Sequence, residues 1–251
     1  MKIISYNING IRAAIRKGFL SWIEQENPDI ICLQEIKATT DQFDVIEFEK
    51  LGYYCAWHSA EKKGYSGVAI LSKEKPEQIL YGCGEQRFDQ EGRVLRAKFK
   101  HLSVFSCYFP SGSSGDIRQS FKMEFLDYFL KFIKNASHDV LICGDFNICH
   151  KSIDIHNPIT NKNTSGFLPE EREWLSNFLQ LGYVDTFREI NPNPHFYSWW
   201  SYRANARANN KGWRIDYHML SANLKNSIKD AQILKDVHHS DHCPILLTLD
   251  L

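Results

Sequence analysis

The chain has 251 residues, of which 43% are hydrophobic and 24% are charged, and its formal net charge is zero. This composition predicts a globular protein with a sizeable core, and it excludes binding to nucleic acid through overall positive charge while allowing a local basic patch. The first residues lack the basic start and long apolar stretch of a signal peptide, and no apolar run approaches membrane-spanning length, so we expect a soluble, intracellular, cytoplasmic protein.

Seven cysteines are spread along the chain without a C-x-x-C pair. Several lie inside apolar runs, where a small buried thiol is commoner than a disulfide or a zinc site. We therefore expect reduced cysteines and a reducing compartment.

Strand-like runs recur along the chain, rich in β-branched and aromatic residues and bounded by Gly, Pro, Asn or Asp. In chain order they cover residues 3–6, 30–34, 53–57, 67–71, 94–99, 104–108, 140–143, 215–220 and 245–249. Helical patterns lie between them: one ends at Asn27-Pro28, one carries phenylalanines from Phe121 to Phe132 that we assign to core packing, and one begins at Pro169. These elements predict a two-sheet core flanked by helices, as a single domain over residues 1–251.

Polar residues stand at the ends of four of these strands. They are Asn7 and Asn9, Gln34 and Glu35, Asp145 and Asn147, and Asp241 and His242. Asp145 and Asn147 lie two residues apart, a spacing that places both on one face of a strand. Each pattern also has a purely structural explanation, because Asx pairs form turns, a lone Glu serves as a cap or surface residue, and a histidine can belong to the core.

The combination of polar residues at four strand ends favours a catalytic site over separate structural roles. Carboxylates and amides without thiolates suit Mg²⁺ or Mn²⁺ rather than zinc. Mg²⁺ usually takes one or two protein carboxylates and shares a substrate phosphate, while an aspartate beside a histidine polarises the imidazole. The four strand ends therefore predict a metal-assisted phosphate-ester hydrolase.

Eight motifs follow one another along the chain: NINGIRA, PDIICLQEIK, YSGVAILS, DQEGRV, CYFPSG, ICGDFNICH, GWRIDY and SDHCPI. In content and order they resemble the exonuclease III / AP endonuclease family of DNA-repair enzymes, and NARANNKGWRIDY is similar to the eukaryotic-type branch. The resemblance implies an α/β fold, a four-layer α/β sandwich in which two packed, mostly antiparallel β-sheets are flanked by helices. It also implies Mg²⁺-dependent cleavage, with Mn²⁺ as a substitute, of the phosphodiester bond 5′ of an abasic site in duplex DNA. Removal of blocked 3′ ends, 3′→5′ exonuclease activity and a monomeric state are typical of relatives.

The resemblance assigns roles to matching positions. Asp145 would activate the attacking water, Asn147 would hold Asp145, and His242, oriented by Asp216, would contact the scissile phosphate. The catalytic residues would be Tyr108, Asp145, Asn147, Asp216 and His242. The metal site would comprise Asn7, Glu35, Asp145, Asn147 and Asp241.

Residues 191–215 contain no Asp or Glu and interleave aromatic residues with arginines, a composition that suits a nucleic-acid surface. One of its two adjacent tryptophans is expected in the core in any case. In the family, the positions of Trp199, Trp213 and Ile215 line the pocket for the flipped abasic sugar, and Arg203 stands where relatives insert a side chain into the duplex. The DNA contacts implied are Arg12, Lys17, Tyr65, Arg93, Asn161, Trp199, Tyr202, Arg203, Arg207 and Trp213. Several of these, taken alone, are equally explained as ordinary surface residues.

Two departures from the family pattern and two other functions remain open. Asn9 stands where some relatives have an Asp, and Ser111-Gly112-Ser113-Ser114 replaces a loop that contains Asn and Arg in eukaryotic-type enzymes. A phosphatase or phosphodiesterase of the same superfamily with another substrate is the first alternative. The second is a catalytically inactive DNA-binding protein, which predicts the loss of at least one catalytic residue, whereas all of them are present.

Overall fold

The computed structural model describes residues 1–136 and 139–251. Its described strands form two six-stranded sheets. The first sheet has the order β11 (Ile228–Ile233), β12 (Ile245–Leu249), β1 (Lys2–Asn7), β2 (Ile30–Gln34), β4 (Val68–Ser72) and β3 (Tyr54–His58). The second has the order β5 (Gln78–Tyr81), β6 (Val94–Lys98), β7 (Ser103–Tyr108), β8 (Val140–Asp145), β10 (Asp216–Ser221) and β9 (Tyr183–Asp185).

Each sheet contains one parallel pair of strands at its centre. β1 runs parallel to β2, β7 runs parallel to β8, and all other neighbours are antiparallel. β2 and β8 are buried at every residue, as expected for apolar strands that are covered on both faces. The two sheets pack face to face, with β1 against β8, β2 against β7 and β4 against β6.

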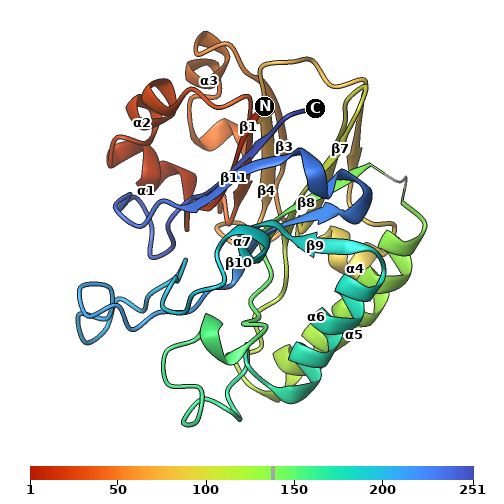
Figure 1. Cartoon of the computed structure of the whole chain (residues 1–251). Coiled ribbons are helices and arrows are strands. Elements are labelled where there is room, and N and C mark those ends of the chain that lie inside the picture. The colour runs from red at the N-terminus through yellow and green to blue at the C-terminus, as the bar shows by residue number, and fades with distance from the viewer. Residues whose placement is uncertain (137–138) are drawn as a thin grey trace.

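Helices cover the outer faces of both sheets (Figure 1). On the first sheet these are α1 (Ile11–Arg16), α2 (Phe19–Glu26) and α3 (Ile46–Lys50). The second sheet carries α4 (Gln86–Asp89), α5 (Asp116–Lys134) and α6 (Pro169–Gln180), while α7 (Thr186–Ile190) contacts both β10 and β11. Three 3₁₀ turns complete the described elements: η1 (Thr40–Gln42), η2 (Ser152–Asp154) and η3 (Ala222–Ser227).

The core is divided by the sheets into layers. One cluster, including Cys32, Val104 and Leu141, fills the space between the sheets. A second joins the phenylalanines of α5 to the outer face of β7 and β8, and a third joins α1 and α2 to the first sheet. The predicted four-layer sandwich is therefore confirmed, and the phenylalanine pattern is core packing.

The nine predicted strands are all present, with ends displaced by at most two residues. The prediction missed β5, β9 and β11. β5 and β11 lie at or near sheet edges and alternate exposed with partly buried residues, and β9 has only three residues, so none gives a continuous apolar run. None of the helices in the described ranges combines the length and apolar character needed to cross a bilayer. All seven cysteines are free thiols, and six are buried.

Candidate functional site

The polar strand ends meet at one edge of the sandwich. Because β1 and β2 run parallel, as do β7 and β8, their C-terminal ends lie at the same edge. β12 and β10 run antiparallel to β1 and β8, so their first residues lie there too. In register, Tyr108 pairs with Asp145, and Asp145 pairs with Asp216. The topology thus gathers side chains from six strands, as the strand-end pattern predicted.

Two carboxylates from different sheets approach each other through one amide. The Asn7 side-chain nitrogen donates to Glu35 Oε1 at 2.8 Å and to Asp145 Oδ2 at 2.9 Å. Asn7 Oδ1 accepts the backbone N–H of Asn9 at 3.1 Å. In this arrangement Asn7 holds the two carboxylates, and its role as a direct metal ligand stays a prediction.

Asp145 and Asn147 are brought together by a turn. β8 ends at Asp145, and Asn147 has a left-handed backbone with φ of 52°. The backbone N–H of Asn147 donates to Asp145 Oδ1 at 2.8 Å, and its side-chain nitrogen donates to Phe109 O at 3.0 Å. The prediction that strand alternation aligns the two residues was therefore wrong in its cause, because an Asx-type turn performs the alignment.

Glu35 also has a left-handed backbone, with φ of 52°. This conformation costs a non-glycine residue of its type roughly 1–2 kcal/mol. Neighbouring contacts hold it there: Gly10 N donates to Glu35 O at 2.7 Å, and Lys37 Nζ lies 2.6 Å from Glu35 Oε2. Strain of this kind is concentrated at functional sites.

The environment of Asp145 makes its carboxylate a base near neutral pH. Burial raises its pKa to about 7, with Asp216 and Glu35 adding like-charge repulsion and His242 opposing the shift. A base whose pKa lies close to the working pH is best suited to accept a proton during a reaction.

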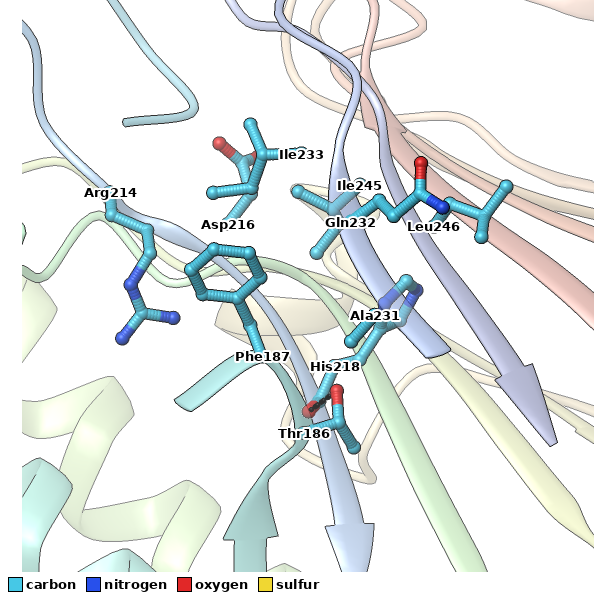
Figure 2. A pocket seen from close by; sticks show the side chains of 10 residues that line it. All are labelled: Thr186, Phe187, Arg214, Asp216, His218, Ala231, Gln232, Ile233, Ile245 and Leu246. Carbon is cyan, nitrogen blue, oxygen red and sulfur yellow. Dashed lines mark hydrogen bonds between the residues drawn. The ribbon is translucent and has the colours of Figure 1, made fainter. Parts of the chain in front are cut away.

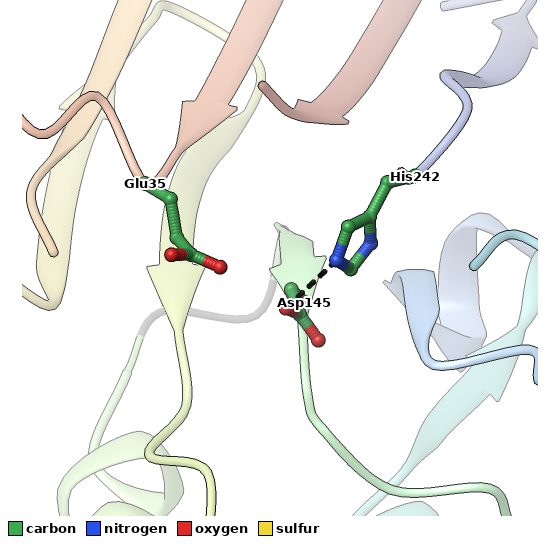
Figure 3. A group of neighbouring side chains, drawn as sticks. All are labelled: Glu35, Asp145 and His242. Atoms are coloured by element: carbon green, nitrogen blue, oxygen red, sulfur yellow. Dashed lines mark ion pairs between the residues drawn. The ribbon is translucent and has the colours of Figure 1, made fainter. Parts of the chain in front are cut away.

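His242 lies between two aspartates. Its Nδ1 is 2.9 Å from Asp216 Oδ2, and its Nε2 is 3.8 Å from Asp145 Oδ2. Burial lowers the pKa of His242, but the charge and hydrogen bond of Asp216, followed by Asp145, outweigh it and raise the pKa to about 10. His242 is therefore an imidazolium at neutral pH, with Nε2 directed toward Asp145 (Figure 3).

The same residues offer a place for a cation. Glu35, Asp145 and His242 each present one potential ligand atom, and these atoms lie within 4.8 Å of one another (Figure 3). The protonated imidazole is a poor ligand, which leaves two carboxylates with an excess of negative charge. Oxygen donors in this number fit Mg²⁺ or Mn²⁺ completed by water and phosphate.

A pocket of about 330 Å³ opens beside this cluster. Its walls include Trp199, Trp213 and Ile215, together with Tyr108, Asp145 and His242. The two indoles meet edge to face, with ring centroids 5.9 Å apart and planes at 85°. Gly166 also lines the pocket: its φ is +95°, and a Cβ there would lie 2.8 Å from the Trp213 ring.

Asp241 is part of the pocket wall. Its Oδ1 accepts Asn9 Nδ2 at 2.9 Å, and its Oδ2 accepts the indole N–H of Trp199 at 3.0 Å. Asp241 thus links Trp199 in the pocket wall to Asn9, which follows β1. A metal-ligand role for Asp241 remains a prediction.

The predicted DNA-contact residues differ in exposure. Arg12, Lys17 and Arg203 are exposed, Asn161 is half-buried, and Tyr202 is 70% exposed. Trp200 is the core tryptophan of the pair. Arg207 donates to the backbone carbonyls of residues 235, 237 and 240, so this guanidinium has a structural role as well as any role toward DNA.

Arg93 does not fit the surface contact predicted for it. Its side chain is only 1% exposed and donates to Glu91, to Tyr108 O and to Tyr65 Oη. Arg118 donates to the same Tyr65 hydroxyl at 2.9 Å. Arg93 therefore holds the Tyr65 hydroxyl and the Tyr108 backbone from a buried position, and its charge is not exposed to a phosphate.

Part of the basic segment also turns inward. Arg214 is 1% exposed and pairs with Asp154 at 2.7 Å and with Asp185 at 2.6 Å. Arg188 pairs with the same Asp154 at 2.6 Å. We call Asp154, Asp185, Arg188 and Arg214 the arginine network; it fixes the start of β10 and adds nothing to the surface charge.

Sequence reasoning missed several supporting residues. Lys37 contacts Glu35 and donates to Asn9 Oδ1, and its position inside the motif PDIICLQEIK was the available signal. Lys122, fully buried, donates to Asn147 O at 2.8 Å and to Glu171 at 2.5 Å. No local pattern marks Lys122, because its partners come from distant parts of the chain.

The comparisons with known proteins agree with this arrangement. The model of the endonuclease/exonuclease/phosphatase family matches residues 4–242. An exodeoxyribonuclease of Bacillus subtilis is 45% identical and covered end to end by this chain. The DNA repair nuclease APEX1 of Danio rerio is 39% identical over 99% of this chain and 82% of its own length. The solved structure of an AP endonuclease from Archaeoglobus fulgidus superposes over the whole of both chains with a TM-score of 0.93 at 30% identity. With the strand-end cluster in place and the family model matched over nearly its whole length, the chain belongs to the endonuclease/exonuclease/phosphatase family.

Proposed function

We propose that this protein is a Mg²⁺-dependent DNA-repair nuclease that cleaves the phosphodiester bond 5′ of an abasic site in duplex DNA. The observation that carries the proposal is the approach of His242 Nε2 to within 3.8 Å of Asp145 Oδ2, next to a pocket walled by Trp199 and Trp213. Trimming of blocked 3′ ends and 3′→5′ exonuclease activity belong to the same proposal. The names of the relatives, an exodeoxyribonuclease and a DNA repair nuclease, support it.

The proton of the attacking water would pass to Asp145. Its Oδ2 lies at the pocket wall, 3.8 Å from His242 Nε2, and the Asn147 N–H together with the Asn7 amide fixes the orientation of the carboxylate. The water oxygen forms a bond to phosphorus as the bond from phosphorus to the 3′ oxygen breaks. The 3′ oxygen then takes a proton and leaves as a 3′-hydroxyl.

Positive charge and a phenol face the reacting phosphate. Asp216 keeps His242 protonated and aimed, so Nε2–H can stabilise charge on a phosphate oxygen as it develops. Burial, followed by the nearby Glu35, raises the pKa of Tyr108, so its hydroxyl keeps its proton and can donate to the phosphate or the leaving group. These donors are in place before substrate binds and need no reorganisation during the reaction.

The carboxylates would hold a divalent cation. Glu35 and Asp145 are the ligands we propose, with Asn7 and Asp241 at the margin of the site. When bound, Mg²⁺ would neutralise negative charge on the phosphate and polarise it toward attack. Without a cation, Glu35, Asp145 and Asp216 leave the site with more negative than positive charge, which would repel a phosphate.

The pocket accounts for lesion selection. Trp199, Trp213 and Ile215 surround a volume of about 330 Å³ beside the cluster. Bulky apolar walls would accept a sugar that lacks its base and resist an intact nucleotide. Exposed Arg12 and Lys17 would hold backbone phosphates on either side, and Tyr202 and Arg203 would meet the duplex at the lesion.

We further propose that residues 1–251 act as one domain and as a monomer, because both sheets contribute to a single complete site. The seven free cysteines support a reducing, intracellular location.

Incision of a labelled duplex with one central abasic site tests the proposal. Wild type is assayed with Mg²⁺ and with EDTA, beside an undamaged duplex and a duplex with a blocked 3′ end. We expect Mg²⁺-dependent cleavage 5′ of the lesion, and Glu35→Gln should require a higher Mg²⁺ concentration than the exposed control Glu77→Gln. A folded wild type that leaves abasic DNA intact but hydrolyses another phosphate ester would favour the alternative function within the superfamily.

A further inference from the structure

A buried serine stands directly behind the Asp216–His242 pair. Ser198 is 0% exposed, and its hydroxyl donates to Asp216 Oδ2 at 2.6 Å. The same hydroxyl accepts the backbone N–H groups of Ile215 and Asp216, both at 3.2 Å. The oxygen that Ser198 contacts is the one that also accepts the bond from His242 Nδ1.

The other oxygen of Asp216 has no partner. Among the described residues, Asp216 Oδ1 is buried without a hydrogen bond. Asp216 lines a small cavity together with apolar residues such as Phe187 and Ile233 and with the polar side chains of Arg214 and His218 (Figure 2). Its volume of about 10 Å³ is at the lower limit for a single water molecule. Within the described protein, Ser198 and His242 are therefore the side chains that donate to this carboxylate.

The backbone of Ser198 also anchors His242. Ser198 O accepts the N–H of Cys243 at 2.8 Å, and Ser198 N donates to Trp213 O at 3.0 Å. Trp199, the next residue, pairs across the backbone with His242. Ser198 thus touches the histidine segment through its carbonyl and the orienting aspartate through its hydroxyl.

We propose that Ser198 is a positioning residue that sets the orientation of Asp216 and, through it, of the His242 imidazolium. The inference rests on the proposed function, because it assigns His242 to the reacting phosphate. Ser198 is not among the residues that line the pocket, so it would act on a phosphate there only through Asp216 and His242. Two donors on one carboxylate oxygen fix its rotation about the last side-chain bond, whereas His242 alone would leave the carboxyl group free to turn toward the cavity.

The test compares Ser198→Ala with Ser198→Thr and with Ser221→Ala. Ser221 is the matched control, since it is a buried serine at the opposite end of β10 whose hydroxyl accepts the Val140 N–H at 3.0 Å. We expect Ser198→Ala to lower kcat on abasic duplex about 10-fold to 100-fold, the range for losing a hydrogen bond to a charged group, with KM nearly unchanged. Ser198→Thr, which keeps the hydroxyl, should recover most of this loss, and Ser221→Ala should leave kcat unchanged.

A second readout needs no substrate. The proton on His242 Nδ1 lies in a buried hydrogen bond of 2.9 Å to the Asp216 carboxylate and should give a downfield NMR signal in wild type and in Ser221→Ala. In Ser198→Ala we expect that signal to shift or broaden while the protein stays folded, as thermal unfolding would verify.

The outcomes separate this inference from the proposed function. If wild type cleaves abasic DNA and Ser198→Ala matches it in both kcat and the NMR signal, Ser198 is only a structural serine and the inference is overturned. If wild type does not cleave abasic DNA, the proposed function fails, and the NMR comparison alone still decides whether Ser198 orients the pair. Equal loss of kcat in Ser198→Ala and Ser221→Ala would also overturn it.

Discussion

Two buried clusters of charge lie on either side of the first residue of β10, and they are built in opposite ways. The arginine network sets two aspartates against two guanidiniums, and every contact between them is 2.6–3.2 Å. The catalytic cluster, which we define as Glu35, Asp145, Asp216 and His242, sets three carboxylates against one imidazolium. A single residue, Ile215, separates Arg214 from Asp216 in the sequence.

The pKa values follow this difference. Burial would raise the pKa of Asp154, but Arg214 and Arg188 outweigh it and lower the pKa to about 2. Burial and the like charges of Asp216 and Glu35 raise the pKa of Asp145 to about 7. Paired charge holds the chain in place, whereas unbalanced charge at a pocket is available for chemistry. Matched substitutions in the two clusters should therefore separate activity from stability.

Asp145→Asn should have the largest effect, and on activity. We expect incision to fall 10²-fold to 10⁴-fold, the usual contribution of a general base, because the amide cannot take the proton. The melting temperature should change little, since a repulsive buried charge is removed along with its hydrogen bonds. Single-turnover incision and thermal unfolding measure both quantities. A strongly destabilised but fully active variant would reverse the assignment of roles.

Asp154→Asn should lower stability and leave activity nearly unchanged. Removing one partner of a buried ion pair leaves Arg188 and Arg214 partly uncompensated, which costs about 3–5 kcal/mol of unfolding free energy. Denaturant unfolding would measure the loss, with the exposed Asp127→Asn as control, expected within about 0.5 kcal/mol of wild type. Incision per folded molecule should stay near the wild-type rate. An unchanged stability would show that the network contributes nothing net.

The two clusters should respond to pH in opposite directions. Folded Asp154 has a lowered pKa, so its stabilisation is present above pH 4 and is lost as pH falls toward 2. Folded Asp145 has a raised pKa, so the folded state holds an extra proton and stability falls as pH rises from about 4 to 7, by up to roughly 1.4 kcal/mol per pH unit. Unfolding in EDTA between pH 4.5 and 7 would reveal this slope, and Asp145→Asn should flatten it. An identical slope in both proteins would argue against the raised pKa.

The smallest effect concerns charges that face solvent. Arg12→Ala and Lys17→Ala should each weaken DNA binding by about 1 kcal/mol or less and reduce the slope of log affinity against log salt by about 1. Lys100→Ala, at the far end of the β6–β7 turn, is the matched control and should do neither. Binding titrations between low and high salt would show the difference. Unaltered slopes would place the DNA on another face.

The sequence identified the residues that end apolar strands, because burial and periodicity are local properties. Asn7, Glu35, Asp145 and His242 were all found in this way and lie together. The burial of Arg93 and Arg214 could not be predicted from the sequence. Their partners, Tyr65 and Asp154, are distant along the chain and come close only in the folded protein. Ser198 and Lys122 were missed for the same reason: a single serine or lysine carries no pattern until its neighbours in space are known.

The way in which the two sheets face each other has one more consequence. Each sheet has its parallel pair of strands in the third and fourth positions. Between the sheets, β1 packs against β8 and β2 packs against β7. Strand ends that face one another across the two sheets bring Asn7 opposite Asp145 and Glu35 opposite Tyr108, and β12, which His242 precedes, faces β10, which begins at Asp216. Each of the two sheets therefore contributes one residue to every pair. Catalytic activity therefore depends on how the two sheets are aligned. A shift of one sheet relative to the other should abolish activity even if the hydrogen bonds within each sheet are kept.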